Sequence, residues 1–456
     1  MKKYDALIIG FGKGGKTLAG ALALAGKSVA VAERSDKMYG GTCINVGCIP
    51  SKSLVHSAEL SAAQGGGFEE KARRYRAAVQ EKEKLTGMLR KKNFEKLDSH
   101  PNITVLTGAA SFTGPKRAVV AAKEGAVEIE ADQVFLNTGS RPFVPPIPGL
   151  KESRYFYLSE TLLDLEELPK RLVIIGGGYI GMEFASIYTN FGSQVTVIQD
   201  GGVFLPREDE EIAQAVRQSL EARGVKVLLS AKVQAVRDAE GFALVEVETG
   251  GKREILEAEA VLAATGRRPN TAGLNLEAAG VELTERGAVK TDASLRTTAP
   301  DVWAMGDVAG GLQFTYISLD DFRIVKSQVL GGAERDAANR GAVPYSVFLD
   351  PPFSRVGLSE KEAREKGYDV GIAKLPASAI PKAQVLRQPT GLLKAVIDAN
   401  TGWILGAHLF CAESYEVINL IKLAMDAKLP YTALRDAIYT HPTMSEALND
   451  LFANIS

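Results

Sequence analysis

Residues 4–15 read YDALIIGFGKGG, and this stretch decides the fold class of the chain. The apolar run of residues 4–9 predicts a buried β-strand, and a glycine-rich loop follows it directly. Residues 16–25, rich in alanine and leucine, predict a helix, and residues 28–32 predict a second strand that ends at Glu33. A strand, a G-x-G-x-x-G loop, a helix and an acidic residue at this distance are together typical of the Rossmann βαβ unit, which binds dinucleotides.

The glycines of this loop have separate roles in such a unit. Gly10 forms the tight turn, Gly12 lets the backbone approach a pyrophosphate, and Gly15 allows the helix to pack closely on the strand. Glu33 can accept a hydrogen bond from a ribose hydroxyl.

The same unit recurs further along the chain. Residues 171–175 are apolar, residues 176–181 read GGGYIG, and residues 182–191 predict a helix. Residues 194–198 predict the closing strand, which leads to Gln199 where the first unit has an acid. The spacing from the first glycine of the loop to this position is the same in both units.

A shorter motif is also duplicated, because residues 137–142 read NTGSRP and residues 264–269 read ATGRRP. A dehydrogenase with a single cofactor would not need this duplication. The sequence therefore predicts two similar domains that bind two dinucleotides.

A cysteine pair follows the first unit, where residues 40–52 read GGTCINVGCIPSK. Cys43 and Cys48 lie five residues apart on a predicted helix, and a distortion at Gly47 would let them close a strained, easily reduced disulfide. The helix N-terminus and the cation of Lys52 would lower the pKa of such thiols. The alternatives are two structural thiols or half of a zinc site, although zinc needs about four ligands.

Two further residues could join this chemistry. Cys411 follows an apolar run and is expected to be a small buried hydrophobic residue rather than a third redox thiol. His56 lies one turn after Lys52 and is expected to be packed or on the surface; the alternative is that it briefly holds a soft metal ion together with Cys43 and Cys48. No structural metal site is predicted.

The composition excludes several classes of function. The 456 residues suggest about three domains, and a net charge of −1 with 24% charged residues gives no support for nucleic acid or an anionic membrane as partner. Three cysteines argue against an extracellular disulfide scaffold. No apolar run approaches about 18 residues, so a cytoplasmic protein is expected.

The rest of the chain predicts an additional helix, strand and domain. Residues 69–100 mix acids and bases at helical spacing and predict a solvated helical arm. Residues 301–307 read DVWAMGD and predict a strand with Asp307 just beyond it. A final domain ends near residues 439–446, which read YTHPTMSE.

These motifs, in this order, resemble the flavoprotein pyridine nucleotide–disulfide oxidoreductases, which include dihydrolipoyl dehydrogenase, glutathione reductase and mercuric reductase. The resemblance covers the whole chain. The segments GFGKGGKT, MYGGTCINVGCIPSK and HPTMSEALNDLF are similar to the branch named for bacterial resistance to reactive chlorine. Members of that branch are associated with oxidant stress and with reduction of Cu(II).

The resemblance implies an α/β fold with two Rossmann-like domains and a C-terminal α+β dimerisation domain. The expected boundaries are 1–145 and 269–341 for the FAD-binding domain, 146–268 for the NAD(P)-binding domain, and 342–456 for the dimerisation domain.

The resemblance also assigns residues to both cofactors. Those expected at FAD are Gly10, Gly12, Gly15, Glu33, Gly41, Thr42, Lys52, Ala110, Gly139 and Asp307. Those expected at the nicotinamide cofactor are Gly176, Gly178, Gly181, Glu183, Gln199 and Gly266. Glu183 is expected to pair with Lys52 beside the flavin.

In the implied reaction, electrons pass from NAD(P)H through FAD to a Cys43–Cys48 disulfide and then to an acceptor. Cys48 is the expected thiolate next to the flavin, and Cys43 the expected thiol that meets the acceptor. His441, oriented by Glu446, is the expected acid–base group for Cys43. Because this histidine serves the partner subunit in the family, a homodimer is expected.

The acceptor and the coenzyme stay open. Gln199 removes the charge that repels a 2′-phosphate, Asp200 restores part of it, and no arginine precedes Arg207, which favours NADH over NADPH. Oxidant defence with Cu(II) reduction is the leading prediction. The alternatives are mercuric reductase, dihydrolipoyl dehydrogenase or another disulfide reductase, a quinone acceptor, or a flavin-bearing sensor without turnover, and a metal ion could be substrate or inhibitor.

Overall fold

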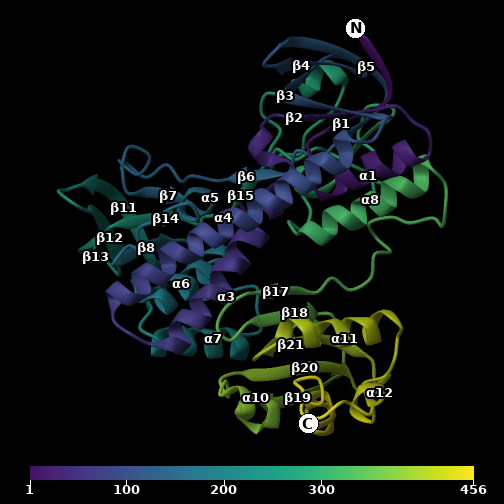
Figure 1. Ribbon diagram of the computed structural model, residues 1–456. Helices are drawn as coiled ribbons and strands as arrows, with labels where there is room; N and C mark the ends of the chain where they lie inside the picture. The colour runs from purple at the N-terminus through teal and green to yellow at the C-terminus, as the bar shows by residue number, and fades with distance from the viewer. Residues whose placement is uncertain (456) are drawn as a thin grey trace. The chain divides into compact units, whose positions relative to one another are not determined.

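The computed structural model describes residues 1–455, and the chain divides into two compact units (Figure 1). Unit 1 comprises residues 1–53, 78–143 and 266–340, and unit 2 comprises residues 54–77, 144–265 and the chain from 341 onward. Two helices, α3 (Cys48–Gln64) and α4 (Phe68–Asp98), contribute residues to both units. Helix α4 confirms the predicted helical arm.

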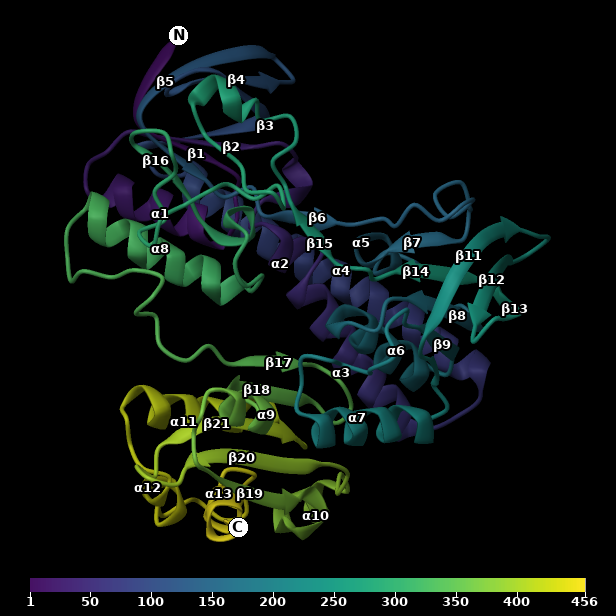
Figure 2. The ribbon, with the colours of Figure 1, turned by 180° about the vertical axis from the view of Figure 1, so that it is seen from behind.

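Unit 1 is built on one sheet with helices α1 and α8 beside it (Figure 2). Its strands are β1 (Lys2–Ile9), β2 (Val29–Glu33), β3 (Ile103–Gly114), β4 (Arg117–Ala122), β5 (Gly125–Leu136) and β16 (Val302–Ala304), with a separate pair β6 (Ser140–Pro142) and β15 (Arg267–Pro269). Its helices are α1 (Lys13–Leu24), α2 (Thr42–Asn45) and α8 (Thr315–Val329), with short 3-10 turns η1 (Asp36–Met38), η2 (Leu276–Ala279) and η3 (Gly306–Ala309).

The strands of unit 1 run parallel in the order β3-β2-β1-β5-β16, and β4 joins β3 to β5 as an antiparallel hairpin. A strand buried on both faces of a parallel sheet reads as a continuous apolar run, which explains the sequence of β1. The predicted strand, helix, strand and acid of residues 4–33 are confirmed. The helix begins three residues earlier than predicted, at Lys13, because Gly12 already occupies the N-cap position.

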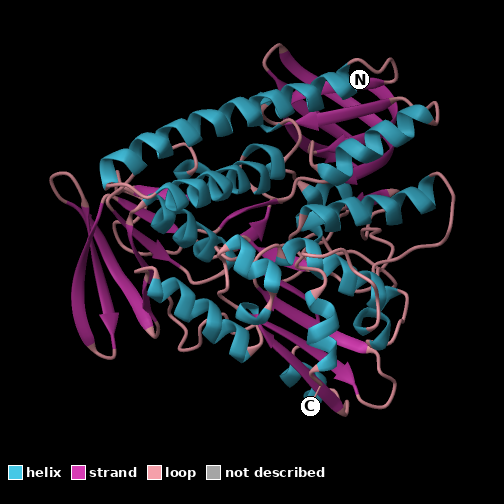
Figure 3. Cartoon of the chain, turned by 60° about the horizontal axis from the view of Figure 1, so that its bottom comes forward, coloured by secondary structure: helices cyan, strands magenta, loops and turns pink. Residues whose placement is uncertain are grey.

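The first half of unit 2 repeats this plan. Strands β10-β9-β8-β14-β7 form a parallel sheet, and β11, β12 and β13 form a separate antiparallel sheet (Figure 3, left). The elements are β7 (Phe156–Leu158), α5 (Ser159–Leu162), β8 (Arg171–Ile175), α6 (Tyr179–Phe191), β9 (Gln194–Ile198), α7 (Glu210–Ala222), β10 (Lys226–Leu228), β11 (Ala231–Asp238), β12 (Ala243–Thr249), β13 (Lys252–Ala258) and β14 (Ala260–Ala263). The second predicted βαβ unit is therefore confirmed.

The C-terminal part of unit 2 is an antiparallel sheet in the order β17-β18-β21-β20-β19, with α11 packed on β18 and β21 (Figure 1). The elements are β17 (Tyr345–Val347), β18 (Phe353–Gly357), α9 (Glu360–Glu365), β19 (Val370–Pro376), η4 (Ala377–Ala379), α10 (Pro381–Leu386), β20 (Leu392–Asp398), β21 (Ile404–Phe410), α11 (Ser414–Asp426), α12 (Thr432–Arg435) and α13 (Ala447–Ala453). Apolar residues of the sheet, α11 and α13 share one core. The predicted α+β class of this part is confirmed.

The two copies of the duplicated six-residue motif meet in space. Strands β6 and β15 pair antiparallel, with Arg267 opposite Pro142 and Pro269 opposite Ser140. The Arg268 guanidinium lies over the Phe143 ring, 3.9 Å from its centroid. Sequence similarity alone did not predict this pairing.

Candidate functional site

The two cysteines lie on two helices, not on one as the sequence predicted. Cys43 belongs to the single turn of α2, and Cys48 is the first residue of α3. The backbone leaves helical geometry at Val46, where φ is −141°, and a Cβ on Gly47 would approach the Thr42 carbonyl oxygen to 3.0 Å. This break brings the side chains together, and both cysteines are in the thiol form, with a hydrogen bond between them.

Thr315, the first residue of α8, contacts this thiol pair. Its Oγ1 lies 3.6 Å from the Cys48 Sγ, and its hydroxyl also hydrogen-bonds the side chain of Cys43. The hydrogen bond with Cys48 raises the pKa of Cys43 most, burial raises it further, and Thr315 lowers it. The pKa of Cys43 is therefore raised, which differs from the lowered thiol pKa expected from the sequence.

Two aromatic rings flank the thiols on the α8 side. Phe314 and Tyr316 stack with centroids 5.2 Å apart and planes 8° apart. Burial, followed by the charge of Cys48, raises the pKa of the Tyr316 phenol. Tyr316 keeps 42% of its surface exposed, so a flat apolar face lies beside the sulfur atoms.

The first glycine loop is held by Asn137, at the end of β5. A Cβ on Gly10, where φ is +105°, would lie 2.3 Å from the Asn137 carbonyl oxygen, so only glycine fits the turn. The Asn137 side chain accepts a hydrogen bond from the Gly15 N–H at 2.9 Å and donates to the Met305 carbonyl oxygen at 2.7 Å. A side chain at Gly12 would meet Asn137 Oδ1 at 2.5 Å, so this protein group occupies the space beside Gly12.

Glu33 lies where the sequence predicted it, buried at the end of β2. Its carboxylate accepts hydrogen bonds from the N–H groups of Phe11 at 3.0 Å and Ser35 at 3.3 Å. Burial raises the pKa of this carboxyl, and these N–H groups lower it.

Asp307 is positioned by a second, partly buried chain of contacts. The Ser140 hydroxyl donates to Asp307 Oδ2 at 2.6 Å, and Arg267 Nε donates to the Ser140 Oγ at 2.8 Å. Burial raises the pKa of Asp307. Gly139, predicted to contact FAD, directly precedes Ser140, and Gly266, predicted to contact the nicotinamide cofactor, directly precedes Arg267. A Cβ at either glycine would meet no atom within 4 Å.

The residues present fit the FAD that the resemblance implies. Helix α1 begins at Gly12 without a side-chain cap and without an acid in its first turn, so its N–H groups and positive end suit a pyrophosphate. Gly41 packs against this turn, because a Cβ there would lie 2.8 Å from Gly12 Cα. Thr42 starts α2, and Ala110 is buried in β3.

The second glycine loop has the same form with one difference. A Cβ on Gly176 would lie 2.5 Å from the Ala264 carbonyl oxygen, and one on Gly181 would lie 2.2 Å from the Gly176 carbonyl oxygen. The space beside Gly178 is open, and α6 begins there without a side-chain cap. Gln199 Oε1 accepts a hydrogen bond from the Gly177 N–H at 2.8 Å. This contact corresponds to the one between Glu33 and the Phe11 N–H in the first loop, but the Gln199 side chain is neutral.

Glu183 lies in the first half of α6, buried, and accepts a hydrogen bond from the Phe348 N–H at 2.9 Å. Lys52 lies on α3 and donates to the Ser51 hydroxyl at 3.3 Å. Because these two residues belong to different units, their expected pairing stays a prediction.

His441 and Glu446 contact each other as the sequence predicted. The His441 Nδ1 lies 2.8 Å from Glu446 Oε2, and this hydrogen bond is the main cause that lowers the pKa of Glu446. The Thr443 N–H donates to the other carboxylate oxygen at 3.2 Å. The His441 side chain is 71% exposed, so its free nitrogen faces outward.

Two other residues fall outside the site. Cys411 is fully buried, and burial raises its pKa to about 12, as expected for a small packed residue. His56 is exposed. Across residues 1–455, no three His, Cys, Asp or Glu side chains lie close enough to hold a metal ion, and no helix is long and apolar enough to cross a membrane.

Sequence reasoning missed Thr315, Asn137 and Ser140. Thr315 is 267 residues from Cys48, and Asn137 is 122 residues from the loop that it holds. No local pattern marks such contacts. The nearest signal was the duplicated motif of residues 137–142, which contains Asn137 and Ser140.

Two family profiles match the chain. Residues 4–321 match the family described as "Pyridine nucleotide-disulphide oxidoreductase", and residues 343–452 match the "Pyridine nucleotide-disulphide oxidoreductase, dimerisation domain".

Curated proteins match over nearly the whole chain. The Escherichia coli (strain K12) "Probable pyridine nucleotide-disulfide oxidoreductase RclA" is 49% identical over 453 residues, 99% of this chain and 99% of that protein. The mercuric reductase of Bacillus cereus is 35% identical over 98% of this chain and 70% of that protein. The dihydrolipoyl dehydrogenase of Mycobacterium tuberculosis (strain ATCC 25618 / H37Rv) is 34% identical over 99% of this chain and 98% of that protein.

A solved structure also matches, described as "Cu(II) complex of HOCl-induced flavoprotein disulfide reductase RclA from Escherichia coli". It has a TM-score of 0.93 and 49% identity over 99% of each chain. The resemblance predicted from the motifs is confirmed.

Proposed function

Because the chain belongs to the pyridine nucleotide-disulphide oxidoreductase family, we propose that Cys43 and Cys48 carry electrons from a nicotinamide cofactor and FAD to an acceptor. The protein is an enzyme of the oxidoreductase class, and the family implies both cofactors. FAD, when bound, supplies the transfer of an electron pair from the nicotinamide to the cysteine pair.

The observation that carries this proposal is the hydrogen-bonded thiol pair at the break between α2 and α3. Two thiols in direct contact can close a disulfide with little movement of the backbone. Cys48 is exposed and Cys43 is partly exposed, which supports access of a small acceptor to the sulfur atoms.

Each remaining residue has a separate task in the proposed reaction. With a disulfide acceptor, the Cys43 thiolate attacks one sulfur and releases the first thiolate, and Cys48 then attacks the Cys43 sulfur, so that the Cys43–Cys48 disulfide forms as the second thiolate leaves. With Cu(II), which accepts one electron, closing the Cys43–Cys48 disulfide reduces two ions to Cu(I). His441 takes the proton of Cys43 and returns it to the leaving group, while Glu446 fixes the orientation of the imidazole. Lys52 and Glu183 are proposed to act beside the flavin.

We further propose that the acceptor belongs to oxidant defence and that Cu(II) is one substrate. This follows the 49% identity to a relative described as HOCl-induced and solved with Cu(II). The relatives named mercuric reductase and dihydrolipoyl dehydrogenase make Hg(II) or a disulfide the second candidate. NADH is the proposed donor, because the neutral Gln199 side chain is already bound to the Gly177 N–H and no arginine lies next to it in the sequence.

The test is an anaerobic titration of the purified holoenzyme with NADH and with NADPH, followed by steady-state assays on Cu(II), Hg(II), lipoamide, glutathione disulfide and a quinone. Long-wavelength absorbance during the titration reports contact between a thiolate and the flavin. We expect the kcat/KM for Cu(II) to exceed that for the disulfides, and the variants Cys43→Ser and Cys48→Ser to lose this activity. Full turnover of either variant with every acceptor would falsify the proposal.

A further inference from the structure

One face of helix α6 is polar, although most of the helix is buried. Glu183, Ser186 and Asn190 are spaced by three and four residues, so they share this face. Their side chains are buried, and only 8% of the surface of Glu183 is exposed. Because a buried polar group is costly unless it is hydrogen-bonded, this face requires a polar partner.

The corresponding helix of the first βαβ unit is not covered in this way. At the same distances from its glycine loop, α1 carries Thr17, Gly20 and Leu24. Thr17 and Gly20 are partly exposed, and Leu24 keeps 82% of its surface exposed. The buried polar face of α6 is therefore an addition to the shared unit, and the dinucleotide-binding plan alone does not account for it.

The segment of residues 345–350 covers this face of α6. It belongs to the part of the chain that matches the dimerisation domain, whereas α6 belongs to the part that matches the first family profile, and both lie in unit 2. Three polar contacts run in the same order along the segment and along the helix. The Tyr179 and Tyr345 hydroxyls lie 3.3 Å apart, the Phe348 N–H donates to Glu183 Oε1 at 2.9 Å, and Asn190 Nδ2 donates to Asp350 Oδ2 at 3.0 Å.

The segment is fixed on both sides of Phe348 and at the Phe348 ring itself. Before it, the Tyr345 hydroxyl donates to Glu208 Oε1 at 2.7 Å; after it, Asp350 is held by its contact with α6. The Phe348 ring stacks on Tyr415 of α11, with centroids 5.4 Å apart and planes 20° apart. The direction of the Phe348 N–H is therefore set by the chain before it, the chain after it and the stacked ring.

This N–H group gives the Glu183 carboxylate a defined position. A hydrogen bond from an N–H to a carboxylate is stronger than one between neutral groups. A backbone donor also lacks the rotamers of a side chain, so it can move only if the segment moves. Small displacements of groups at a reaction centre change rate constants strongly, and Glu183 is proposed to act beside the flavin.

We propose that residues 345–350 position Glu183 for hydride transfer from the nicotinamide to the flavin, with Phe348 as the positioning residue. The hydride takes two electrons and one proton from the dihydronicotinamide to the flavin, and Glu183 neither forms nor breaks a covalent bond. The inference rests on the proposed function, because it requires that Glu183 acts beside the flavin. It gives the dimerisation part of the chain a task in the first half of the reaction.

The experiment measures flavin reduction by NADH in the holoenzyme by anaerobic stopped-flow absorbance. The concentration dependence gives the limiting rate constant and the apparent Kd for NADH separately. We expect Phe348→Ala to lower the limiting rate constant by about tenfold and to leave this Kd nearly unchanged, because a misplacement of about 1 Å costs up to about a hundredfold in rate. Phe348→Tyr keeps the stacked ring and should retain the wild-type rate constant.

A double variant separates positioning from a general loss of stability. If Phe348 acts through Glu183, adding Phe348→Ala to Glu183→Gln should slow reduction by less than about twofold, since the two changes then remove one shared interaction. Tyr431→Ala is the matched control, because Tyr431 also packs on a ring, that of Phe452 in α13, with centroids 6.1 Å apart. It should lower the Tm and leave the rate constant unchanged.

Hydrogen exchange of the oxidised holoenzyme reports on the Phe348 N–H without turnover. The peptide that contains residue 348 should exchange faster in Phe348→Ala and in Tyr415→Leu, while a peptide from β20 keeps the wild-type rate of exchange. Tyr415→Leu removes the stacked ring from the other side, so the inference stays testable if Phe348→Ala does not fold. This variant should lower the limiting rate constant by about threefold, because a stacked pair contributes about 0.5–1.5 kcal/mol.

The outcomes separate this inference from the function on which it rests. If Glu183→Gln reduces the flavin as fast as the wild type, the proposed role of Glu183 fails and this inference falls with it. If Glu183→Gln is slow but Phe348→Ala and Tyr415→Leu match the wild type, only the positioning by residues 345–350 is wrong. Losses that multiply in the double variant, or a change confined to the Kd for NADH, also overturn the inference.

Discussion

The hydroxyl group of Thr315 is the residue-scale feature that connects α8 to the chemistry of the cysteines. It lies 3.6 Å from the Cys48 Sγ and hydrogen-bonds Cys43, and it lowers the pKa of Cys43 against the opposing effect of Cys48. A hydroxyl that donates to a thiolate stabilises the reactive form of the sulfur.

Replacing Thr315 with valine removes this hydrogen bond and keeps the shape of the side chain. We expect the rate of alkylation of Cys43 by iodoacetamide at neutral pH to fall by about threefold to tenfold, because a hydrogen bond of this kind contributes roughly 0.5–1.5 kcal/mol. Mass spectrometry of the reduced protein measures the alkylation rate of each cysteine separately. The measurement covers roughly pH 6 to pH 10, the range in which thiols titrate. Thr315→Ser is the matched control and should react at the wild-type rate; equal rates for all three proteins contradict the prediction.

A second residue-scale prediction concerns Glu59 on α3. The pKa of Glu59 is raised to about 7, chiefly by burial and also by the charge of the nearby Asp350, while Arg223 acts in the opposite direction. The folded protein therefore binds this proton more tightly than the unfolded chain does. The contribution of Glu59 to the free energy of unfolding is full below the ordinary pKa of 4.5 and is lost as the pH rises through about 7.

Glu59→Gln mimics the protonated carboxyl and should remove this loss. Because Glu59 is only partly buried, we expect a gain of about 1–2 kcal/mol in the free energy of unfolding at pH 8, and nearly none at pH 5. Urea unfolding at both pH values measures it. Glu240→Gln, at an exposed position, should change neither value; a gain of the same size at pH 5 would show that the effect does not come from ionisation.

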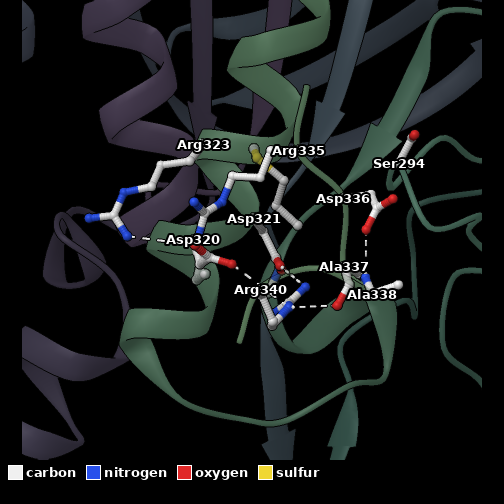
Figure 4. A network of polar contacts seen from close by, with 12 residues as sticks. Ser294, Asp320, Asp321, Arg323, Arg335, Asp336, Ala337, Ala338 and Arg340 are labelled. Carbon is white, nitrogen blue, oxygen red and sulfur yellow. Dashed lines mark hydrogen bonds and ion pairs between the residues drawn. The ribbon is translucent and has the colours of Figure 1, made fainter. Parts of the chain in front are cut away.

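At the scale of elements, the segment after α8 is fastened back onto that helix by ion pairs (Figure 4). Arg340 Nη2 lies 3.0 Å from Asp321 Oδ1, and Arg335 Nη2 lies 2.5 Å from Asp320 Oδ1. The other oxygen of Asp321 accepts a hydrogen bond from the Gly306 N–H at 2.7 Å. Gly306 directly precedes Asp307, so Asp321 and Arg340 are positioning residues for a proposed FAD contact.

Arg340→Met should loosen the loop that carries Asp307, because it leaves the buried Asp321 carboxylate without its cation. We expect the Kd for FAD to rise by about tenfold, since a displaced charge-assisted contact costs roughly 1.5 kcal/mol. Fluorescence titration of the flavin-free protein measures Kd without reliance on turnover. Arg323→Met, which removes a more distant cation at 3.6 Å from Asp320, is the control. If Arg340→Met lowers the Tm but leaves the Kd for FAD unchanged, Arg340 stabilises the fold without positioning Asp307, and the prediction is wrong.

The elements themselves were largely predictable from the sequence, and their contacts were not. Both βαβ units could be predicted because an apolar run, a glycine loop and an alanine-rich helix are local patterns. The sequence did not predict that the cysteine segment divides into two helices at Val46 and Gly47. Helix α3 starts at Cys48, and no Ser, Thr, Asp or Asn, whose side chains cap helices, directly precedes it in the sequence. The loops also differ in a way that the shared motif hides: Asn137 fills the space beside Gly12, whereas the space beside Gly178 is open. Such differences depend on residues more than 100 positions away.

At the scale of the whole molecule, the C-terminal part carries a catalytic candidate on a dimerisation domain. Residues 343–452 match the dimerisation domain of the family, which supports a homodimer. His441 is 71% exposed and bound to Glu446, so its outward nitrogen can serve a site outside its own surroundings. If each active site takes Cys43 from one chain and His441 from the other, two inactive variants can complement each other.

Co-expression of Cys43→Ser with His441→Gln tests this arrangement. Random assembly makes about half of the dimers mixed, and each mixed dimer then has one site with both residues intact and one with both replaced. We expect about a quarter of the wild-type activity from the mixture, whereas each variant alone should be nearly inactive. A site built from one chain would give no recovery, because every site would still lack one of the two residues. Equal flavin content in all preparations, checked by absorbance, ensures that the recovered activity reports the pairing of Cys43 and His441 across the dimer.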